Sequence, residues 1–223
     1  MKKNRETVLT RKNADKFALY LESVQNPPFE IEVINRFYRD RHKKSARLFK
    51  EDFCGTFMLC CEWVKRSAQN QAYGIDLDRP TLDYGRKHHL SKLTADQQSR
   101  LLLKEANVLE VTRPAVDIVA ALNFSYWLFK TREALLAYFQ QAHRSLLPGG
   151  MLVLDAFGGS NSYLEVKERR RLKGFNYVWE HAEFSPVTSE LKCKIHFEFR
   201  DGTVWKNAFT YDWRLWTLPE LRE

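Results

Sequence analysis

The stretch LFKEDFCGTFMLCCEW, residues 48–63, combines a short apolar run, two acids and a tight turn, followed by a helix-like run. This order is typical of a buried strand that passes through a turn into a helix, the repeating unit of parallel α/β sheets. A dinucleotide-binding turn at this place has three glycines. Here only Gly55 is present, with Phe53 and Phe57 on either side. The stretch therefore predicts a strand–turn–helix unit, and it leaves open whether the turn holds a cofactor or only connects two elements.

The same alternation of short apolar runs and longer amphipathic runs continues along the chain. The apolar runs predict strands at 46–53, 72–76, 101–104, 116–122 and 151–157. The amphipathic runs predict helices at 14–25, 29–41, 58–66, 79–88, 95–99 and 131–147, the last ending at the stop signal LLPGG. Strands that lack polar alternation and are separated by helices favour a mostly parallel sheet covered on both faces.

After residue 157 the pattern changes to strict alternation. In residues 190–200 the apolar side chains stand at odd positions and the polar ones at even positions, and Asp201-Gly202 then turns the chain. A three-residue loop at 200–202, with Gly202 in the left-handed region, places the aromatic residues of both strands on one face. We therefore predict an extra antiparallel β region in which Phe197 lies opposite Trp205.

Composition limits the class of protein. The chain has 223 residues, of which 44% are hydrophobic and 13% aromatic, as in a folded globular protein. It has no apolar run of the roughly 20 residues that span a bilayer, and its opening MKKNRETVLT lacks the apolar stretch of a secretory signal. Its four cysteines (Cys54, Cys60, Cys61 and Cys193) have no metal-type spacing, and its histidines have none that supports zinc. We expect a cytoplasmic protein with reduced thiols and no bound metal.

The net charge of +8 is spread over several basic runs, RDRHKK at 39–44, RKHH at 86–89 and KERRRLK at 167–173. Such runs usually form a solvated surface. Binding of RNA or of an anionic substrate is the alternative interpretation.

Each predicted strand ends in polar, glycine or aromatic residues, in the order EDFCGT, GIDLD, EANVLE, ALNFSYW and LDAFGGS. Parallel sheets bind ligands beyond the carboxyl ends of their strands, next to the first strand. Asp76 follows the first turn by about twenty residues, where a carboxylate can accept both hydroxyls of a ribose. The ordered set predicts one ligand site along this edge of the sheet.

This order of motifs resembles the Rossmann-like S-adenosylmethionine-dependent methyltransferases, and in particular a bacterial group whose first motif reads EDFCGT. The resemblance covers about residues 15 to 222. It implies a single methyltransferase domain over 1–223, with N-terminal helices in 1–45, a cofactor-binding core in 46–159 and a β-rich acceptor cover in 160–216. It also answers the question of the turn, because S-adenosylmethionine lacks the pyrophosphate that needs a glycine-rich backbone.

The resemblance implies roles for the residues at the strand ends. Glu51 takes the place of the family's acid after the first strand, and Cys54, Gly55 and Thr56 would approach the amino-acid part of the cofactor through backbone groups. The remaining positions are Asp76 with the following Leu77 at the ribose, Asn107 and Val108 at the adenine, and Asn123 and Phe124 at the methionine and methyl end.

A few residues are candidates for contact with the methyl acceptor and for a catalytic base. NFSY at 123–126 has the Asn-x-x-Tyr spacing of methyltransferases that act on planar amines, but it lacks their two prolines. Asn123, Tyr126 and His181 are the candidate catalytic residues, with packing as the alternative role of Tyr126. We expect a small-molecule acceptor and no membrane partner. The alternatives are an RNA methyltransferase and a non-catalytic S-adenosylmethionine-binding protein.

The end of the chain gives two further expectations. TLPELRE is a helix start in which Thr217 is the N-cap and Glu220 its capping-box partner. Members of the resembled family have two more strands after this helix, so the strand at 151–157 would have an unpaired edge. We expect the strands of 175–213, or another subunit in a homodimer, to cover that edge; otherwise the protein would be marginally stable and poorly active.

Overall fold

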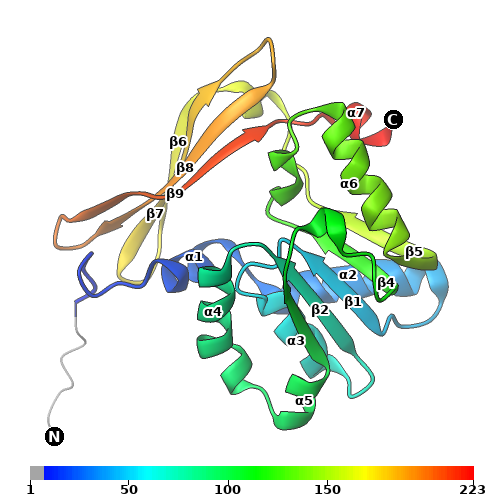
Figure 1. The fold of residues 1–223 in the computed structure, drawn as a ribbon. Helices are drawn as coiled ribbons and strands as arrows, with labels where there is room; N and C mark the ends of the chain where they lie inside the picture. Colours follow the sequence, from blue (N-terminus) through cyan, green and yellow to red (C-terminus); the bar gives the residue numbers. More distant parts are fainter. Residues whose placement is uncertain (1–7) are drawn as a thin grey trace, which may run out of the picture. The chain divides into compact units, whose positions relative to one another are not determined.

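The computed structural model describes residues 8–223, and these divide into two compact units (Figure 1). Unit 2 is the continuous segment Asn26–Ala156. Unit 1 combines the described part of Met1–Gln25 with Phe157–Glu223. No helix among the described residues is both long enough and apolar enough to cross a membrane.

Unit 2 is built on a five-stranded parallel sheet with the strand order β3-β2-β1-β4-β5. Its strands are β1 (Leu48–Asp52), β2 (Gln71–Asp76), β3 (Leu101–Glu105), β4 (Val116–Ala121) and β5 (Leu146–Leu154). The chain runs outward from β1 to β3 and then returns to place β4 on the other side of β1. The order therefore reverses beside β1, and this reversal marks the ligand end of such sheets. The predicted α/β fold is confirmed.

The helices of unit 2 cover both faces of this sheet. They are α2 (Pro27–His42), α3 (Met58–Arg66), α4 (Arg79–His88), α5 (Ala95–Ser99) and α6 (Arg132–Arg144). Ile31 of α2 and Trp63 of α3 lie in one buried cluster with Phe49 of β1. The neighbouring Lys50 points to the other face, where its ammonium reaches Ser145 at the end of α6. Successive residues of one strand thus separate α2 and α3 from α6.

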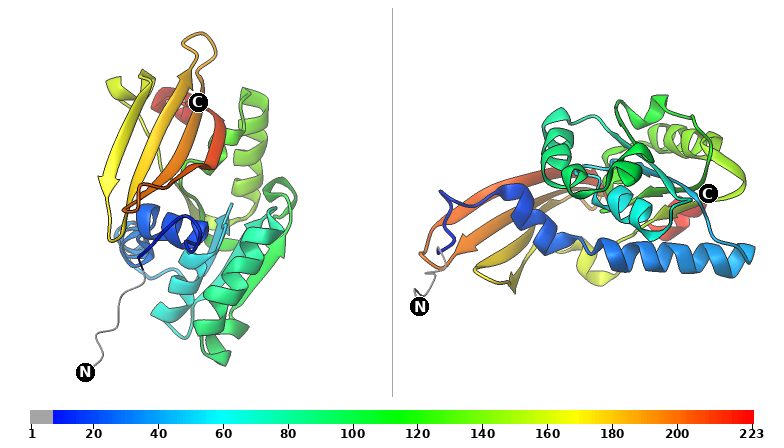
Figure 2. Two further views of the ribbon diagram at one scale, coloured as in Figure 1. Left: turned by 90° about the vertical axis from the view of Figure 1, so that its left-hand side faces the viewer. Right: turned by 90° about the horizontal axis from the view of Figure 1, so that it is seen from below.

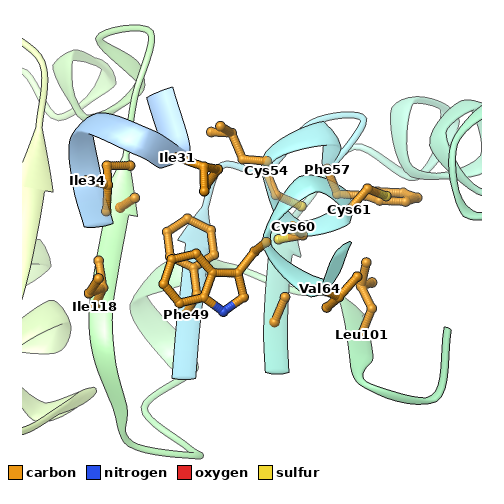
Figure 3. Packing of buried hydrophobic residues seen from close by; sticks show 14 of the residues in the cluster. Ile31, Ile34, Phe49, Cys54, Phe57, Cys60, Cys61, Val64, Leu101 and Ile118 are labelled. Carbon is orange, nitrogen blue, oxygen red and sulfur yellow. The ribbon is translucent and has the colours of Figure 1, made fainter. Parts of the chain in front are cut away.

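Phe49 belongs to the core of unit 2 and stacks on Trp63 with ring centroids 5.0 Å apart. Figure 3 shows Ile31 and Ile34 of α2 on the same side of the sheet as Phe49 and Ile118. Phe49 and Trp63 are both fully buried. Burial of side chains of this size stabilises the fold by roughly 1.5–3 kcal/mol each.

Unit 1 consists of helix α1 (Lys16–Val24) and a four-stranded antiparallel sheet with the order β6-β7-β8-β9 (Figure 2). The strands are β6 (Val166–Arg171), β7 (Phe175–Phe184), β8 (Glu190–Phe199) and β9 (Val204–Arg214), and the short helix α7 (Leu218–Arg222) follows them. Leu19 of α1 is buried among the aromatic side chains on one face of this sheet, including Phe197. The opposite face has mainly polar side chains, among them Lys194, His196 and Glu198 of β8, with Val178 of β7 buried between them. The predicted antiparallel region is confirmed.

The predicted register of the last hairpin is also confirmed. Phe197 pairs with Trp205, Glu198 pairs with Val204, and Gly202 has a φ of 82°. Further along, the pairing shifts between Ile195 and Phe197, and this irregularity keeps the odd-numbered aromatic residues of both strands on one face. The capping box between Thr217 and Glu220 at the start of α7 is likewise present.

The predicted boundary between α6 and β5 was wrong. Leu146 and Leu147, assigned from the sequence to the end of the helix, belong to β5. Ser145 ends the helix by donating its N–H to Gln141, and its own carbonyl accepts the N–H of Val116. The chain thereby joins the sheet at Leu146, opposite Val116, and residues 147–150 form a bulge before the regular pairing resumes. Pro148 in this segment cannot continue a helix.

The N-terminal helices also differ in detail from the prediction. The first seven residues of the predicted segment 1–45 lie outside the described residues. Asn26-Pro27-Pro28, expected only to stop α1, also begins α2: the Asn26 side chain accepts the N–H of Phe29, and the prolines occupy the first turn. Proline is tolerated there because the first helical N–H groups have no partner in the helix.

Strand β5 is an edge of the five-stranded sheet. Among the strands formed by residues 8–223, only β4 pairs with it, and β6 to β9 form a sheet of their own. Backbone pairing by the 175–213 strands, one of the two expected covers, does not occur in the described chain.

Candidate functional site

The turn after β1 has an unusual backbone. Phe53, Gly55 and Phe57 all have positive φ, at 58°, 53° and 51°. This region is unfavourable for a side chain with a Cβ, by on the order of 1–2 kcal/mol per residue. The surrounding protein compensates for the strain at both phenylalanines. Phe57 is fully buried, and the ring of Phe53 lies 5.6 Å from that of Tyr138.

Asp76, at the end of β2, holds this turn in place. Its Oδ2 accepts the N–H of Gly55 at 2.7 Å, and its Oδ1 accepts the N–H of Asp78 at 2.8 Å. A second bond, from the N–H of Cys54 to the carbonyl of Ile75, joins the same two segments at 3.0 Å. Burial raises the pKa of Asp76, although the backbone donors oppose this effect. The sequence-predicted ribose acid and the sequence-predicted turn thus form one hydrogen-bonded assembly.

The other predicted residues of this segment lie around that assembly. Cys54 and Thr56 are buried, so their side chains point away from solvent. Leu77, directly after Asp76, is 69% exposed.

Glu51 is a buried carboxylate near the carboxyl end of β1. It is only 4% exposed, and its Oε2 accepts the thiol of Cys60 at 3.2 Å. Burial raises the pKa of Glu51 to about 8, and the negative fields of Glu30 and Asp76 add to this rise. A positive charge nearby would offset both the burial of this carboxylate and its repulsion by the neighbouring acids. Glu51 is therefore suited to bind a cationic group.

Asn107 caps the short 3₁₀ turn Val108–Glu110 after β3, and its Oδ1 accepts the N–H of Leu109 at 3.0 Å. The N–H of Ala106 donates to the carbonyl of Asp76. The loop after β3 is therefore tied directly to the end of β2. Val108 is buried beneath this turn.

The loop after β4 is organised by Asp155, which the sequence analysis did not single out. Asn123 and Phe124 both have a φ of 56°. Their N–H groups donate to the two oxygens of the Asp155 carboxylate, at 2.7 and 2.9 Å. Tyr126 is fully buried and donates its hydroxyl to the Asp155 carbonyl at 2.8 Å. The side-chain amide of Asn123 makes no hydrogen bond with any of residues 8–223.

These contacts distinguish the two candidate catalytic residues of this loop. Burial raises the pKa of Tyr126 to about 12. A phenol that is buried and engaged with a carbonyl is a poor proton acceptor at neutral pH. Asn123, which is half-buried and has a free amide, keeps its capacity to orient a ligand.

Glu30, in the first turn of α2, is a second residue that the sequence analysis missed. Its Oε2 is buried and has no hydrogen-bond partner among the described residues. Burial raises the pKa of Glu30, and the charge of Asp155 contributes. Glu30, Glu51, Asp76 and Asp155 are thus electrostatically coupled, with pKa values raised mainly by burial.

His181 belongs to the sheet of unit 1. It is buried against Phe157, with ring centroids 5.3 Å apart, and burial lowers its pKa. Both ring nitrogens of His196 are engaged: Nε2 lies 2.6 Å from Glu180, and Nδ1 accepts the N–H of Asn207 at 2.9 Å. His196 therefore fixes β9 at Asn207, where the pairing with β8 shifts, and it has no free nitrogen for proton transfer.

The comparisons with known proteins agree with this architecture. No protein-family model and no curated protein matches the sequence. Among solved structures, an S-adenosylmethionine-dependent methyltransferase from Clostridium acetobutylicum is similar, with a TM-score of 0.71 and 15% identity over 93% of this chain and 83% of that one.

Two further solved structures are similar over nearly the whole chain. The sugar N-methyltransferase KedS8 from Streptoalloteichus has a TM-score of 0.67 and 18% identity, covering 99% of this chain and 86% of its own. The amino pentose methyltransferase CalS10 from Micromonospora echinaspora, solved with bound S-adenosylmethionine, has a TM-score of 0.70 and 14% identity, covering 92% and 84%. At these identities the comparisons show a shared fold.

Proposed function

We propose that the chain is an S-adenosylmethionine-dependent methyltransferase that acts on a small-molecule acceptor. The observation that supports this most directly is the set of coupled carboxylates Glu30, Glu51, Asp76 and Asp155 around the carboxyl ends of the sheet. Their mutual repulsion and burial would be relieved by a ligand with positive charge. S-adenosylmethionine has two such charges, an ammonium and a sulfonium.

The donor set of the site fits the remaining parts of this cofactor. Each oxygen of Asp76 accepts one backbone N–H and keeps a lone pair for a ribose hydroxyl. Glu51 would accept hydrogen bonds from the ammonium group, beside the backbone of Cys54, Gly55 and Thr56. The Oδ1 of Asn107 is used in its own turn, so its amide N–H groups would serve the adenine, flanked by Val108 and Leu77.

When bound, the cofactor supplies an electrophilic methyl group. The protein's part is to align the acceptor and exclude water. Asn123, held by Asp155 through its backbone, would orient the acceptor with its free amide, next to Phe124. Tyr126 acts as a support of this loop. The acceptor cover predicted over 160–216, with His181 in it, stays a prediction.

The small-molecule acceptor rests on the kind of protein that shares the fold. Neighbours with printed activities include sugar and amino pentose methyltransferases and a glycopeptide N-methyltransferase. A direct test is to incubate the protein with methyl-labelled cofactor and a cell extract separated into metabolites, RNA and protein. Label in the metabolite fraction is expected. Label in RNA alone would show that the acceptor is RNA and not a small molecule. Cofactor binding without any transfer would indicate a binding protein.

The cofactor site is tested by replacing its ribose acid. Asp76→Ala removes two acceptors and should weaken S-adenosylmethionine binding at least tenfold, since hydrogen bonds to charged groups contribute about 1.5–3 kcal/mol each. Titration calorimetry measures the change. Asp40→Ala is the matched control, because Asp40 is exposed on α2 and makes no bond with the described residues. Equal affinities of the two variants would contradict the role of Asp76.

A further inference from the structure

The antiparallel sheet of unit 1 contains a cavity of about 280 Å³ at the end of three adjacent strands. Its walls come from the end of β6, the start of β7 and the end of β8, and are formed by Arg171, Leu172, Phe175, Asn176, Glu198, Phe199 and Arg200. All of these residues belong to unit 1, so the cavity is a feature of one compact unit. Its volume is just below the range of roughly 300–1,000 Å³ that is usual for small-molecule sites.

The polar wall follows from strand register. Arg171 pairs with Asn176, and Asn176 pairs with Glu198, so the three side chains form a row on one face of the sheet. Glu198 is already neutralised: Arg169 donates to its two oxygens at 2.8 and 2.7 Å, and Asn176 donates at 3.1 Å. These bonds, above all those from Arg169, lower the pKa of Glu198.

Two positive charges of the cavity remain uncompensated. The guanidinium groups of Arg171 and Arg200 form no hydrogen bond or ion pair with any residue that the structure describes. Glu198, the only acid among the lining residues, is paired with Arg169. The lining residues by themselves have a net charge of +1, and because Glu198 is paired with Arg169, both guanidinium groups remain available to an anion.

The backbone beneath the cavity is held by apolar packing on the other face of the sheet, because Phe175 and Phe199 alternate with Asn176 and Glu198 along their strands. Phe175 and Phe199 are buried and belong to the core cluster of unit 1. The ring of Phe175 packs edge-on against Phe197 at 5.7 Å.

We propose that this cavity binds the phosphate group of a small phosphorylated molecule. Two arginine forks match the tetrahedral oxygens of a phosphate and can each donate two hydrogen bonds to it. This site goes beyond the proposed methyl transfer, and its occupation requires neither the cofactor nor the residues of unit 2.

The test measures binding of inorganic phosphate and of glucose 6-phosphate to the full chain by titration calorimetry, with glucose and a short single-stranded RNA as further probes. One phosphate-dependent site per chain is expected, and glucose alone should give no heat. Arg171→Gln and Arg200→Gln should each weaken glucose 6-phosphate binding about tenfold or more, the loss expected for a charge-assisted hydrogen bond. Arg171→Lys keeps the charge but loses the fork, so its affinity should lie between those of Arg171→Gln and the unaltered protein.

The matched control is Arg222→Gln, which removes the same charge from an exposed position outside the cavity. It should bind glucose 6-phosphate as the unaltered protein does. Circular dichroism establishes that each variant is folded. Binding that is absent, or that all three glutamine variants weaken equally, would overturn the proposal. RNA binding that falls steeply with salt and depends on Arg171 and Arg200, without phosphate binding, would also overturn it in favour of a nucleic-acid surface.

Discussion

At the scale of single residues, Glu51 shows how a residue of the site can lower the stability of the folded state. Its pKa is about 8 in the folded protein and about 4.3 in an unfolded chain. The folded state therefore binds more protons between these values. The stability associated with Glu51 is fully present below the unfolded pKa and is lost as the pH rises toward 8, at about 1.4 kcal/mol per pH unit.

Glu51→Gln should consequently raise the melting temperature at pH 8, by about 2–4 °C for each kcal/mol recovered, while it weakens binding of S-adenosylmethionine. The glutamine keeps an acceptor for the Cys60 thiol but has no charge to lose. Thermal melting at pH 5 and pH 8 measures the effect, which should be present only at the higher pH. Glu22→Gln, at an exposed position of α1, should leave both melting temperatures unchanged. Equal melting curves for Glu51→Gln and the unaltered protein at pH 8 would contradict this account.

Lys50 and Asp52 form a second buried pair, on the opposite face of β1. Their side chains are 2% and 1% exposed, with Nζ 2.9 Å from Oδ1. Nζ also donates to the carbonyl of Val111 at 2.7 Å, and the Tyr138 hydroxyl donates to Asp52 at 3.2 Å. The pair thus links β1 to α6 and to the loop before β4.

Lys50→Met leaves Asp52 as a buried charge without its cation, and should cost about 3–5 kcal/mol of unfolding free energy. The double variant Lys50→Met/Asp52→Leu removes both charges and should recover most of that loss. Urea unfolding measures both values. A double variant that is as unstable as the single one would show that packing, and not the unpaired charge, determines the cost.

The residue scale also marks the limit of what the sequence could predict. Asp76 was predicted because an acid about twenty residues after the first turn follows from the spacing of the strands. Asp155 was not predicted, because its role is to accept the backbone N–H groups of Asn123 and Phe124. The order of side chains in a sequence does not indicate such bonds. Glu30 was missed because it comes from a helix whose place beside the strand ends is a result of packing.

At the scale of elements, the close contact of α4 with the turn after β1 depends on Gly85. A Cβ at this position would lie 2.4 Å from a ring carbon of Phe57 and 2.6 Å from the carbonyl oxygen of Thr56. The carbonyl belongs to the backbone of the turn, so it cannot move without displacing the turn itself. The single glycine of the first motif is thus complemented by a second one in the next helix.

Gly85→Ala should destabilise the protein by about 1–3 kcal/mol through this overlap and weaken cofactor binding. Inside a helix the same substitution normally stabilises by about 1 kcal/mol, so the sign of the change identifies the contact. Unfolding free energies and calorimetric titration measure the two effects. Gly158→Ala is the control, since a Cβ there meets no atom within 4 Å. A stabilised Gly85→Ala would show that α4 can move away from the turn without loss.

The prediction succeeded where the alternation of side chains between the two faces of a strand determines the structure. It failed where backbone hydrogen bonding determines the boundary of an element. The register of Phe197 with Trp205 follows from placing both aromatic sets on one face. The end of α6 could not be predicted in this way, because Leu146 fits an apolar helix face as well as it fits a strand. Its pairing with Val116 selects the strand. The bulge at Asn207, whose N–H donates to His196, has no sequence signal of its own.

At the scale of the whole molecule, unit 2 is continuous in sequence, and unit 1 is assembled from segments on either side of it. The alternation of strands and helices predicted the parallel sheet of unit 2 and the change of pattern predicted the antiparallel sheet of unit 1. The assignment of α1 to the antiparallel sheet was not predictable, because an amphipathic helix shows that it has a partner but does not show which one.

The division into a continuous and a discontinuous unit has a consequence for folding kinetics. Helix α1 packs on strands that follow residue 157, as in the contact of Tyr20 with Phe209 at 5.0 Å. Closing a loop that contains all of unit 2 is slow compared with forming the more local pairings of β1, β2 and β4. We expect pulse-labelled hydrogen exchange during refolding to protect the amides of β1 and β4 first, and those of α1 only together with β8 and β9. Protection of α1 as early as β1 would show that this helix is stable before its sheet exists. On a ribosome, where the chain grows from its N-terminus, α1 would emerge well before β8 and β9 and would stay unburied until those strands are made.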